Sequence, residues 1–331
     1  MKSGILGIAR KVTDRLRPGH HWLAGKYREI PLALAELRTK LAGGDARTHT
    51  SGVNPENLVW IFSSSGRSGS TWLRSIMGEM PRHRVWEEPM VGRLFGDFYR
   101  RAQTANLRSA NFIMGDPIRK GWIRSIRNFV LDGARYVQPR LGPEEYLVIK
   151  EPNGSVGAPL LMEALPESRM ILLIRDPRDV VASTLDGARE GNWLYEWKDE
   201  SGWKRGSLPD KNPNAFVRNR SSTYVRHAGK AKEAFDSHRG HKVLVRYEDL
   251  RANTLAEMKR LYATLEIPVQ DKELARAVEK HSWENIPEEK KGEGKFYRKA
   301  TPGGWQEDLT PKQAQIVERI TAPLLNEFYP A

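Results

Sequence analysis

The sequence contains no cysteine among its 331 residues. This absence excludes thiol nucleophiles, disulfide scaffolds and cysteine-ligated zinc or iron–sulfur sites, and it fits a reducing compartment. No run approaches the roughly 18 apolar residues that span a bilayer. Residues 1–9 are too short and too interrupted by glycine for a secretory signal. We therefore expect a cytoplasmic protein.

Negative charge is scarce, because 41 Asp and Glu face 54 Lys and Arg and leave a net charge of +13. The excess favours an anionic partner: nucleic acid, an anionic membrane surface, or a phosphorylated or sulfated small molecule. A nucleic-acid-binding module is one alternative, but the sequence shows no recognition motif of a known class and its basic residues are dispersed. We expect no nucleic-acid partner, and the oligomeric state stays open.

Residues 1–57 differ from the rest in their sequence pattern and are predicted to form a basic helical leader. Apolar residues from Ile5 to Leu16 fall on one face of a helix, with Lys and Arg beside them. Such a segment can lie on the inner face of an anionic membrane, or it can pack on its own domain as an ordinary amphipathic helix.

From Leu58 onward, short apolar runs alternate with helical periodicity. The runs cover residues 58–62, 146–149, 170–174 and 243–245, and residues 83–89 are predicted to be a further strand that runs into a loop. Buried strands separated by helices indicate an α/β protein with a mostly parallel sheet. Ligands bind beyond the carboxyl ends of such strands, so the residues that follow each run are the candidates for function.

A loop of small residues follows the first strand and opens a helix. It reads Ser63-Ser64-Ser65-Gly66-Arg67-Ser68-Gly69-Ser70-Thr71-Trp72. The backbone N–H groups of such a loop, added to the positive end of the helix, form a cradle for phosphate or sulfate. The lysine of a Walker A motif is missing, which counts against a P-loop nucleotide kinase. The plain alternative is an ordinary Ser/Gly-rich turn.

A second candidate segment follows the strand at 170–174. Arg175 stands at the strand end, Asp176 is the predicted N-cap of the next helix and Pro177 its first residue. This places Ser183 about two turns into that helix.

Together with two later segments, these motifs resemble the sulfotransferases that use 3′-phosphoadenosine 5′-phosphosulfate (PAPS) and release 3′-phosphoadenosine 5′-phosphate (PAP). Residues 66–73 are similar to the family's 5′-phosphosulfate loop, 175–183 to its 3′-phosphate motif, 246–250 to its Tyr-Glu-Asp segment and 298–305 to its late basic loop. The resemblance implies a P-loop-like three-layer fold over residues 58–331, in which helices flank a central, mostly parallel sheet. PAPS would be the cofactor.

The resemblance also assigns roles to individual residues. The implied cofactor-binding residues are Arg67, Ser68, Gly69, Ser70, Thr71, Trp72, Arg175, Ser183, Tyr247, Arg298 and Lys299. Arg67 and Lys150 are the predicted catalytic cations, because negative charge grows on the bridging oxygen of the leaving nucleotide. Lys150 can also be a solvated lysine at a strand end, and Trp72 can serve core packing. We predict no metal.

A hydroxyl acceptor must lose its proton, and a sequence without an obvious active histidine points to a carboxylate base. By resemblance to carbohydrate sulfotransferases we choose Glu88, with Glu87 second and Glu151 third. Two adjacent glutamates can equally be solvated side chains. Pro152 stands where phenol and steroid sulfotransferases carry a histidine, which counts against that class.

Residues 186–226 are predicted to form an insertion or lid on the acceptor side. Its aromatic residues are interleaved with Lys and Arg: Trp193, Tyr195, Trp197, Trp203 and Tyr224. Exposed aromatics beside cations suit stacking on sugar rings, and long insertions are often lids. A satellite hydrophobic cluster is the alternative. We expect a carbohydrate or glycolipid hydroxyl as the acceptor, with a small aromatic alcohol or secondary metabolite as the alternative.

Overall fold

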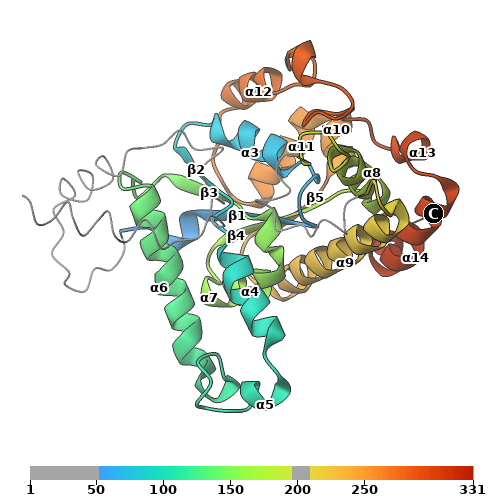
Figure 1. Ribbon diagram of the computed structural model, residues 1–331. Helices are drawn as coiled ribbons and strands as arrows, with labels where there is room; N and C mark the ends of the chain where they lie inside the picture. Colours follow the sequence, from blue (N-terminus) through green and yellow to red (C-terminus); the bar gives the residue numbers. More distant parts are fainter. Residues whose placement is uncertain (1–51, 196–208, 331) are drawn as a thin grey trace, which may run out of the picture.

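The computed structural model describes residues 52–195 and 209–330 (Figure 1). The amphipathic helix that the sequence predicts near the N-terminus lies outside the described residues, as do Trp197 and Trp203. Val53 packs in the core at 6% exposure. The folded domain therefore extends a few residues ahead of the boundary predicted at Leu58.

A five-stranded sheet forms the centre of the molecule, with the order β2-β3-β1-β4-β5. Its strands are β1 (Leu58–Ser63), β2 (His83–Glu87), β3 (Tyr146–Lys150), β4 (Arg169–Ile174) and β5 (Lys242–Arg246). Every pair of neighbouring strands is parallel. β1, β3 and β4 are buried along their whole length, as continuous apolar runs in a covered sheet require.

Helices cover both faces of the sheet, and the alternation along β1 shows how. Val59 and Ile61 point into one core with helices α3 (Ser70–Gly78), α11 (Thr254–Thr264) and α12 (Asp271–Lys280). Trp60 and Phe62 point into the other core, with α6 (Arg119–Val137), α7 (Ala158–Ala164), α9 (Pro213–Ser237) and α14 (Pro311–Phe328). The prediction of a three-layer α/β fold with a parallel sheet is confirmed.

The remaining helices are α4 (Val91–Arg101), α5 (Thr104–Leu107), α8 (Pro177–Gly187), α10 (Tyr247–Ala252) and α13 (Trp305–Asp308). Helix α8 begins as predicted, because the Asp176 side chain accepts a hydrogen bond of 2.8 Å from the backbone N–H of Arg178. In the described parts of the chain, no helix combines the length and the apolar character that crossing a bilayer requires.

The carboxyl ends of the strands bring the predicted site residues to one edge of the sheet. Ser63 ends β1, Glu87 ends β2 and Lys150 ends β3, while Arg175 and Tyr247 directly follow β4 and β5. Residues that are far apart in the sequence thus meet at the edge where parallel sheets bind ligands.

Candidate active site

The loop between β1 and α3 has a conformation that depends on glycine at one position. Gly69 has φ of 90°, and a Cβ built there would lie 2.5 Å from the ring of Tyr247. No side chain caps α3, so the first N–H groups of this helix keep their donor capacity. Inside the loop, the Ser68 hydroxyl donates to Ser63 Oγ at 2.9 Å. The loop is a preformed cradle for an anionic group.

Arg67 leaves this loop and reaches the second predicted motif. Its Nε donates to Ser183 Oγ at 2.9 Å and its Nη2 to the carbonyl oxygen of Phe296 at 2.7 Å. The guanidinium also lies over the rings of Trp193 and Phe296, at 5.1 and 4.9 Å from their centroids. These contacts group Arg67 with the 3′-phosphate motif, whereas the sequence placed it beside Lys150.

Arg67, Arg175 and Arg298 form what we call the arginine cluster. Burial first, and then the nearby charges of Arg175 and Arg298, lower the pKa of Arg67 to about 10. Arg175 donates from Nη1 to the Arg67 carbonyl at 3.1 Å and lies 4.2 Å from the ring centroid of Tyr247. Within residues 52–195 and 209–330, its buried Nε has no hydrogen-bond partner. An anion bound here would relieve repulsion among like charges.

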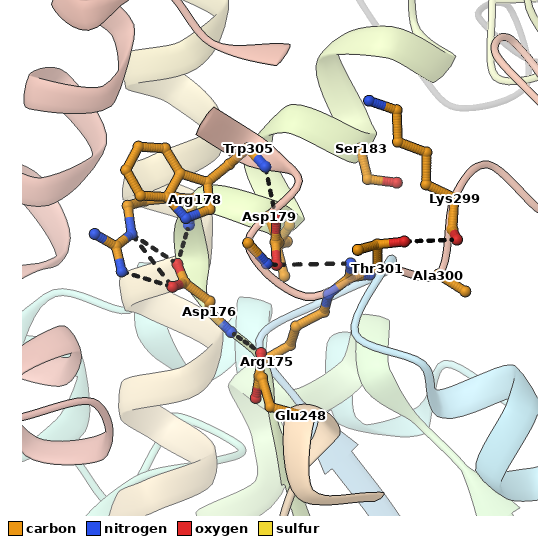
Figure 2. Close-up of polar contacts among 12 residues, drawn as sticks. Arg175, Asp176, Arg178, Asp179, Ser183, Glu248, Lys299, Ala300, Thr301 and Trp305 are labelled. Atoms are coloured by element: carbon orange, nitrogen blue, oxygen red, sulfur yellow. Dashed lines mark hydrogen bonds and ion pairs between the residues drawn. The ribbon is translucent and has the colours of Figure 1, made fainter. Parts of the chain in front are cut away.

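Asp179 holds the late basic loop against α8. Figure 2 shows its fully buried carboxylate accepting hydrogen bonds of 2.9 and 3.0 Å from the backbone N–H groups of Gly303 and Trp305. Burial raises the pKa of Asp179, and Arg175, 3.9 Å away, opposes that rise. Sequence analysis missed this residue, although its place one turn into the helix after Arg175 was a signal.

The two cations of the late loop are paired within their own segment. Arg298 donates to Asp308 at 2.5 Å, and Lys299 donates to Glu307 and Asp308 at 2.8 and 3.0 Å. These two acceptors raise the pKa of Lys299. Figure 2 places the Lys299 side chain on the same side of α8 as Ser183. The structure thus brings the late loop to the second motif, as the sequence predicts.

A second group, which we call the lysine cluster, consists of Lys150, Thr71, Glu87 and Glu88. The ammonium group of Lys150 donates to Glu87 at 2.8 Å, to Glu88 at 2.6 Å and to the Thr71 hydroxyl at 3.1 Å. Its side chain is only 4% exposed. Lys150 is therefore no solvated lysine at a strand end: it connects the phosphosulfate loop with both candidate bases.

Glu88 is held in a left-handed backbone conformation with φ of 46°. Its N–H donates to the Lys150 carbonyl at 2.8 Å, and the Asn153 amide donates to its Oε2 at 3.0 Å. A non-glycine residue in this conformation costs about 1–3 kcal/mol and persists where its surroundings fix it. The carboxylate is partly exposed, at 34%. Sequence analysis missed Asn153, since nothing in the sequence shows which way an amide points.

Glu87 differs from its neighbour in its partners. It pairs with Lys150 and also with Arg74 of α3, so two cations hold its carboxylate. Glu88 pairs with one cation and one amide. Of the two adjacent glutamates, Glu88 has the carboxylate that is less committed to ion pairs.

Glu151, the third candidate base, is fully buried. Its two carboxylate oxygens accept hydrogen bonds of 3.0 Å from the backbone N–H groups of Met90 and Gly92 at the start of α4. Burial raises its pKa to about 8, against the effect of these two donors. Glu151 thus holds the loop between β2 and α4, which carries Glu88, and its role as the base stays a prediction.

Trp72 and Tyr247 lie together beside the loop. The Trp72 indole donates to the His281 carbonyl at 2.7 Å, and its ring meets that of Tyr247 edge to face at 6.0 Å. Trp72 is only partly buried against the core. Packing is thus shown for Trp72, and stacking on an adenine stays a prediction.

Two aromatic residues of the predicted insertion, Tyr224 and Trp193, lie in different places: one in the core and one beside Arg67. Tyr224 is 1% exposed, and its hydroxyl donates to the Arg175 carbonyl at 2.8 Å. This residue therefore belongs to the core and cannot stack on a sugar. Trp193 lies against the Arg67 guanidinium of the arginine cluster. A lid on the acceptor side stays a prediction for the rest of residues 186–226.

No group of three or more His, Cys, Asp or Glu side chains in the described segments has a geometry that could hold a metal ion.

Comparison with known proteins decides the family. A model of the sulfotransferase family matches residues 63–271, well over half of the 331 residues. The chain belongs to the sulfotransferase family. The resemblance in the sequence motifs is thereby confirmed.

One solved structure supports the fold, and a second is similar to the chain at a lower TM-score. Sulfotransferase STF9 from Mycobacterium avium is 14% identical, with a TM-score of 0.53 over 90% of this chain and 82% of that one. Mouse sulfotransferase SULT7A1, crystallised with PAP, is 16% identical, with a TM-score of 0.47 over 87% of this chain and 88% of that one. No curated protein matches the chain.

Proposed function

We propose that this sulfotransferase moves the sulfuryl group of PAPS to a hydroxyl group of a carbohydrate or glycolipid. One observation carries the proposal: the arginine cluster and the lysine cluster meet at the same edge of the sheet, on either side of the β1–α3 loop. Arg67 of this loop contacts Ser183, and Thr71 at the start of α3 contacts Lys150. A nucleotide with anionic groups at both ends suits such a loop.

The arginine cluster supports binding of the 3′-phosphate. The Ser183 hydroxyl and the guanidinium groups of Arg67 and Arg175 would donate to its oxygens, in charge-assisted hydrogen bonds. The Tyr247 ring fills the space that a Cβ on Gly69 would need, so glycine lets the β1–α3 loop pack closely against Tyr247. Binding of this phosphate would offset the repulsion between the positively charged guanidinium groups.

The lysine cluster supports the chemistry. Glu88 would take the proton of the acceptor hydroxyl, whose oxygen then forms a bond to sulfur while the bond from sulfur to the bridging oxygen of the nucleotide breaks. Lys150 would place its positive charge at that bridging oxygen, where negative charge grows. Thr71 and Asn153 position these two groups. PAP leaves as the product.

The acceptor class follows from the base. A sugar hydroxyl is weakly acidic, so its transfer needs a general base, and a partly exposed carboxylate beside a cation can serve. An aromatic alcohol ionises more readily and depends less on a base. The carboxylate at Glu88, together with Pro152 at the position of the histidine in phenol and steroid enzymes, favours the carbohydrate or glycolipid hydroxyl.

Chromatographic measurement of PAP released from PAPS tests this function. The protein is incubated with PAPS alone, with neutral and anionic sugars, with a glycolipid and with a set of phenols. We expect release that depends on a sugar or glycolipid. Faster release with phenols would transfer the proposal to the aromatic-alcohol alternative, and no release with any acceptor would contradict sulfuryl transfer.

A further inference from the structure

The segment from α4 to α6 projects from the domain (Figure 1) and carries exposed apolar side chains. Of the large hydrophobic residues that are exposed among the described ones, seven lie in it: Leu94, Phe98, Ile113, Ile118 and Phe129, and, in the last turn of α6, Tyr136 and Val137. Ile113, near the end of the projection, is 71% exposed. Single exposed apolar residues are ordinary, but a group on one projecting segment marks an interaction surface.

Helix α4 turns one face to the domain and the other outward. Gly92 and Gly96 lie so close to the turn that precedes α7 that a Cβ on Gly92 would be 2.1 Å from the Gly154 carbonyl oxygen. Leu94 and Phe98, four residues apart, share a different side of the helix and are 55% and 52% exposed. The glycine face of α4 is thus packed against the domain, and the face with Leu94 and Phe98 is exposed.

The apolar side chains form connected pairs across the projection. The rings of Phe98 and Phe112 lie 5.8 Å apart, and those of Phe95 and Phe129 lie 5.4 Å apart, edge to face. In each pair a partly buried ring supports an exposed one. These four rings, together with Leu94, Ile113 and Ile118, form what we call the apolar strip. It extends over α4, α6 and the connection between them.

The segment that carries this strip has an excess of positive charge, although Arg93, Arg100, Arg119 and Arg127 are in ion pairs. Residues 91–137 contain nine Lys and Arg against three Asp and Glu, a net charge of +6 out of +13 for the chain. Arg226 of α9 adds to them. Burial, then Arg100 and Arg93, lower its pKa, and Asp97 opposes them. Arg226, Arg100 and Arg93 thus lie close together, and a negative charge on a partner would reduce the repulsion between them.

We propose that the α4–α6 projection docks on an anionic lipid surface. A lipid interface accepts apolar side chains at its boundary and attracts the cations around them, which matches both properties of the strip. Helix α4 begins at Val91, three residues after Glu88. Docking would therefore bring the catalytic edge to a lipid surface and to an acceptor held there. This last consequence rests on the proposed function, whereas docking itself does not.

Cosedimentation with vesicles tests the proposal on the full chain. The vesicles consist of phosphatidylcholine alone or mixed with phosphatidylglycerol. The double variant Phe98→Ser/Ile113→Ser should partition at least about tenfold more weakly than wild type onto the anionic vesicles, because two interfacial apolar side chains are lost. Tyr136→Ser is the matched control: Tyr136 is 76% exposed, but it lies in the last turn of α6 beside β2, where Gln138 donates to the Val85 carbonyl, and outside the two connected ring pairs, so this variant should partition as wild type.

Added salt and omission of phosphatidylglycerol should both weaken binding of the wild type, since screening and loss of anionic lipid reduce the electrostatic part. PAP affinity and thermal stability should be unchanged in the double variant, because both side chains are exposed. PAP binding is measured without vesicles, so it tests the proposed function independently of docking, and a failure of one can be told from a failure of the other.

Two outcomes would overturn the proposal. The leader is a competing membrane contact, so Ile5→Ser/Ile8→Ser is measured beside the projection variant. Loss of vesicle binding in the leader variant, with normal binding in Phe98→Ser/Ile113→Ser, would assign the contact to the leader. Absence of vesicle binding in the wild type would overturn it as well. Sedimentation velocity would then show whether the same double variant dissociates a dimer.

Discussion

The two charged clusters at the edge of the sheet are built in opposite ways. In the arginine cluster, groups of the same sign lie close together under burial, which lowers the pKa of Arg67 to about 10. In the lysine cluster, one cation is in direct contact with two carboxylates and a hydroxyl. The first arrangement keeps an excess of positive charge around Arg67 until an anion binds, and the second is balanced once Arg74, the other partner of Glu87, is counted with it.

This difference separates two tasks that the reaction needs. Under the proposed function, the cluster with excess positive charge would gain free energy on binding a phosphate and would determine nucleotide affinity. The balanced cluster would fix a proton acceptor and a cation at set positions and would determine the rate of transfer. Changes in one cluster should therefore alter one property and leave the other nearly intact.

The largest expected effect belongs to Glu88→Gln. Glutamine keeps the size of the side chain and can keep one of its two accepted hydrogen bonds, but it cannot take the proton. Turnover should fall roughly 10²–10⁴-fold, while PAP affinity barely changes. Steady-state rates and calorimetry on the same preparation measure the two quantities.

Glu87→Gln is the matched control for that experiment. Because Glu87 is held by Arg74 and Lys150, its loss should lower turnover less than the loss of Glu88. Near-normal turnover in Glu88→Gln with a collapse in Glu87→Gln would move the base to Glu87. Should both stay active, the acceptor needs no strong base, and the preference for a sugar hydroxyl would be wrong.

The next largest effect belongs to Arg175→Ala or Ser183→Ala. Loss of a charge-assisted hydrogen bond to the 3′-phosphate should weaken PAP binding by about 1.5–3 kcal/mol. Adenosine 5′-phosphosulfate lacks this phosphate and should bind both variants as it binds wild type. If wild type and variant distinguish the two nucleotides equally well, the arginine cluster does not hold the 3′-phosphate.

Glu151→Gln should change stability with pH and change turnover less than about tenfold, because Glu151 holds a loop and does not touch the acceptor. Burial raises its pKa from 4.5 to about 8, so folding binds a proton between these pH values. Wild-type stability should thus fall by a few kcal/mol relative to the variant as pH rises through this window. Denaturant unfolding at several pH values measures it. A collapse of turnover in this variant would restore Glu151 as the base.

The smallest expected effect is that of removing metal ions. Because the arginine cluster and Lys150 supply positive charge at both ends of the nucleotide, transfer from PAPS should continue in excess EDTA. Rates with and without the chelator check this. Loss of turnover in EDTA that Mg²⁺ restores would show that these cations are not sufficient.

The sequence predicts the backbone of this site well. Apolar runs locate the strands to within one or two residues, and Asp176-Pro177 locates the start of α8. The sheet rule then places Lys150 and Arg175 at the same edge. These features are local or depend on topology alone, so periodicity and capping residues are enough to find them.

Side-chain direction was the part that the sequence did not predict. Arg67 lies in the phosphosulfate loop but reaches Ser183, a residue more than a hundred positions away. Asp179 and Asn153 have no special pattern, and their roles depend on backbone N–H groups and carboxylates brought near by tertiary packing. Glu151 is the third candidate base in the sequence, and its burial and its two backbone partners appear only in the structure.

Calorimetric titration with PAP, ATP and a short oligonucleotide tests the central claim most directly, that the arginine cluster receives a 3′-phosphate. PAP should bind tightly and the other two weakly, with Arg175→Ala losing the preference for PAP. Tight binding of ATP with no preference for PAP would indicate a nucleotide kinase, and tight binding of the oligonucleotide alone would indicate a nucleic-acid-binding module. Either result would contradict the account.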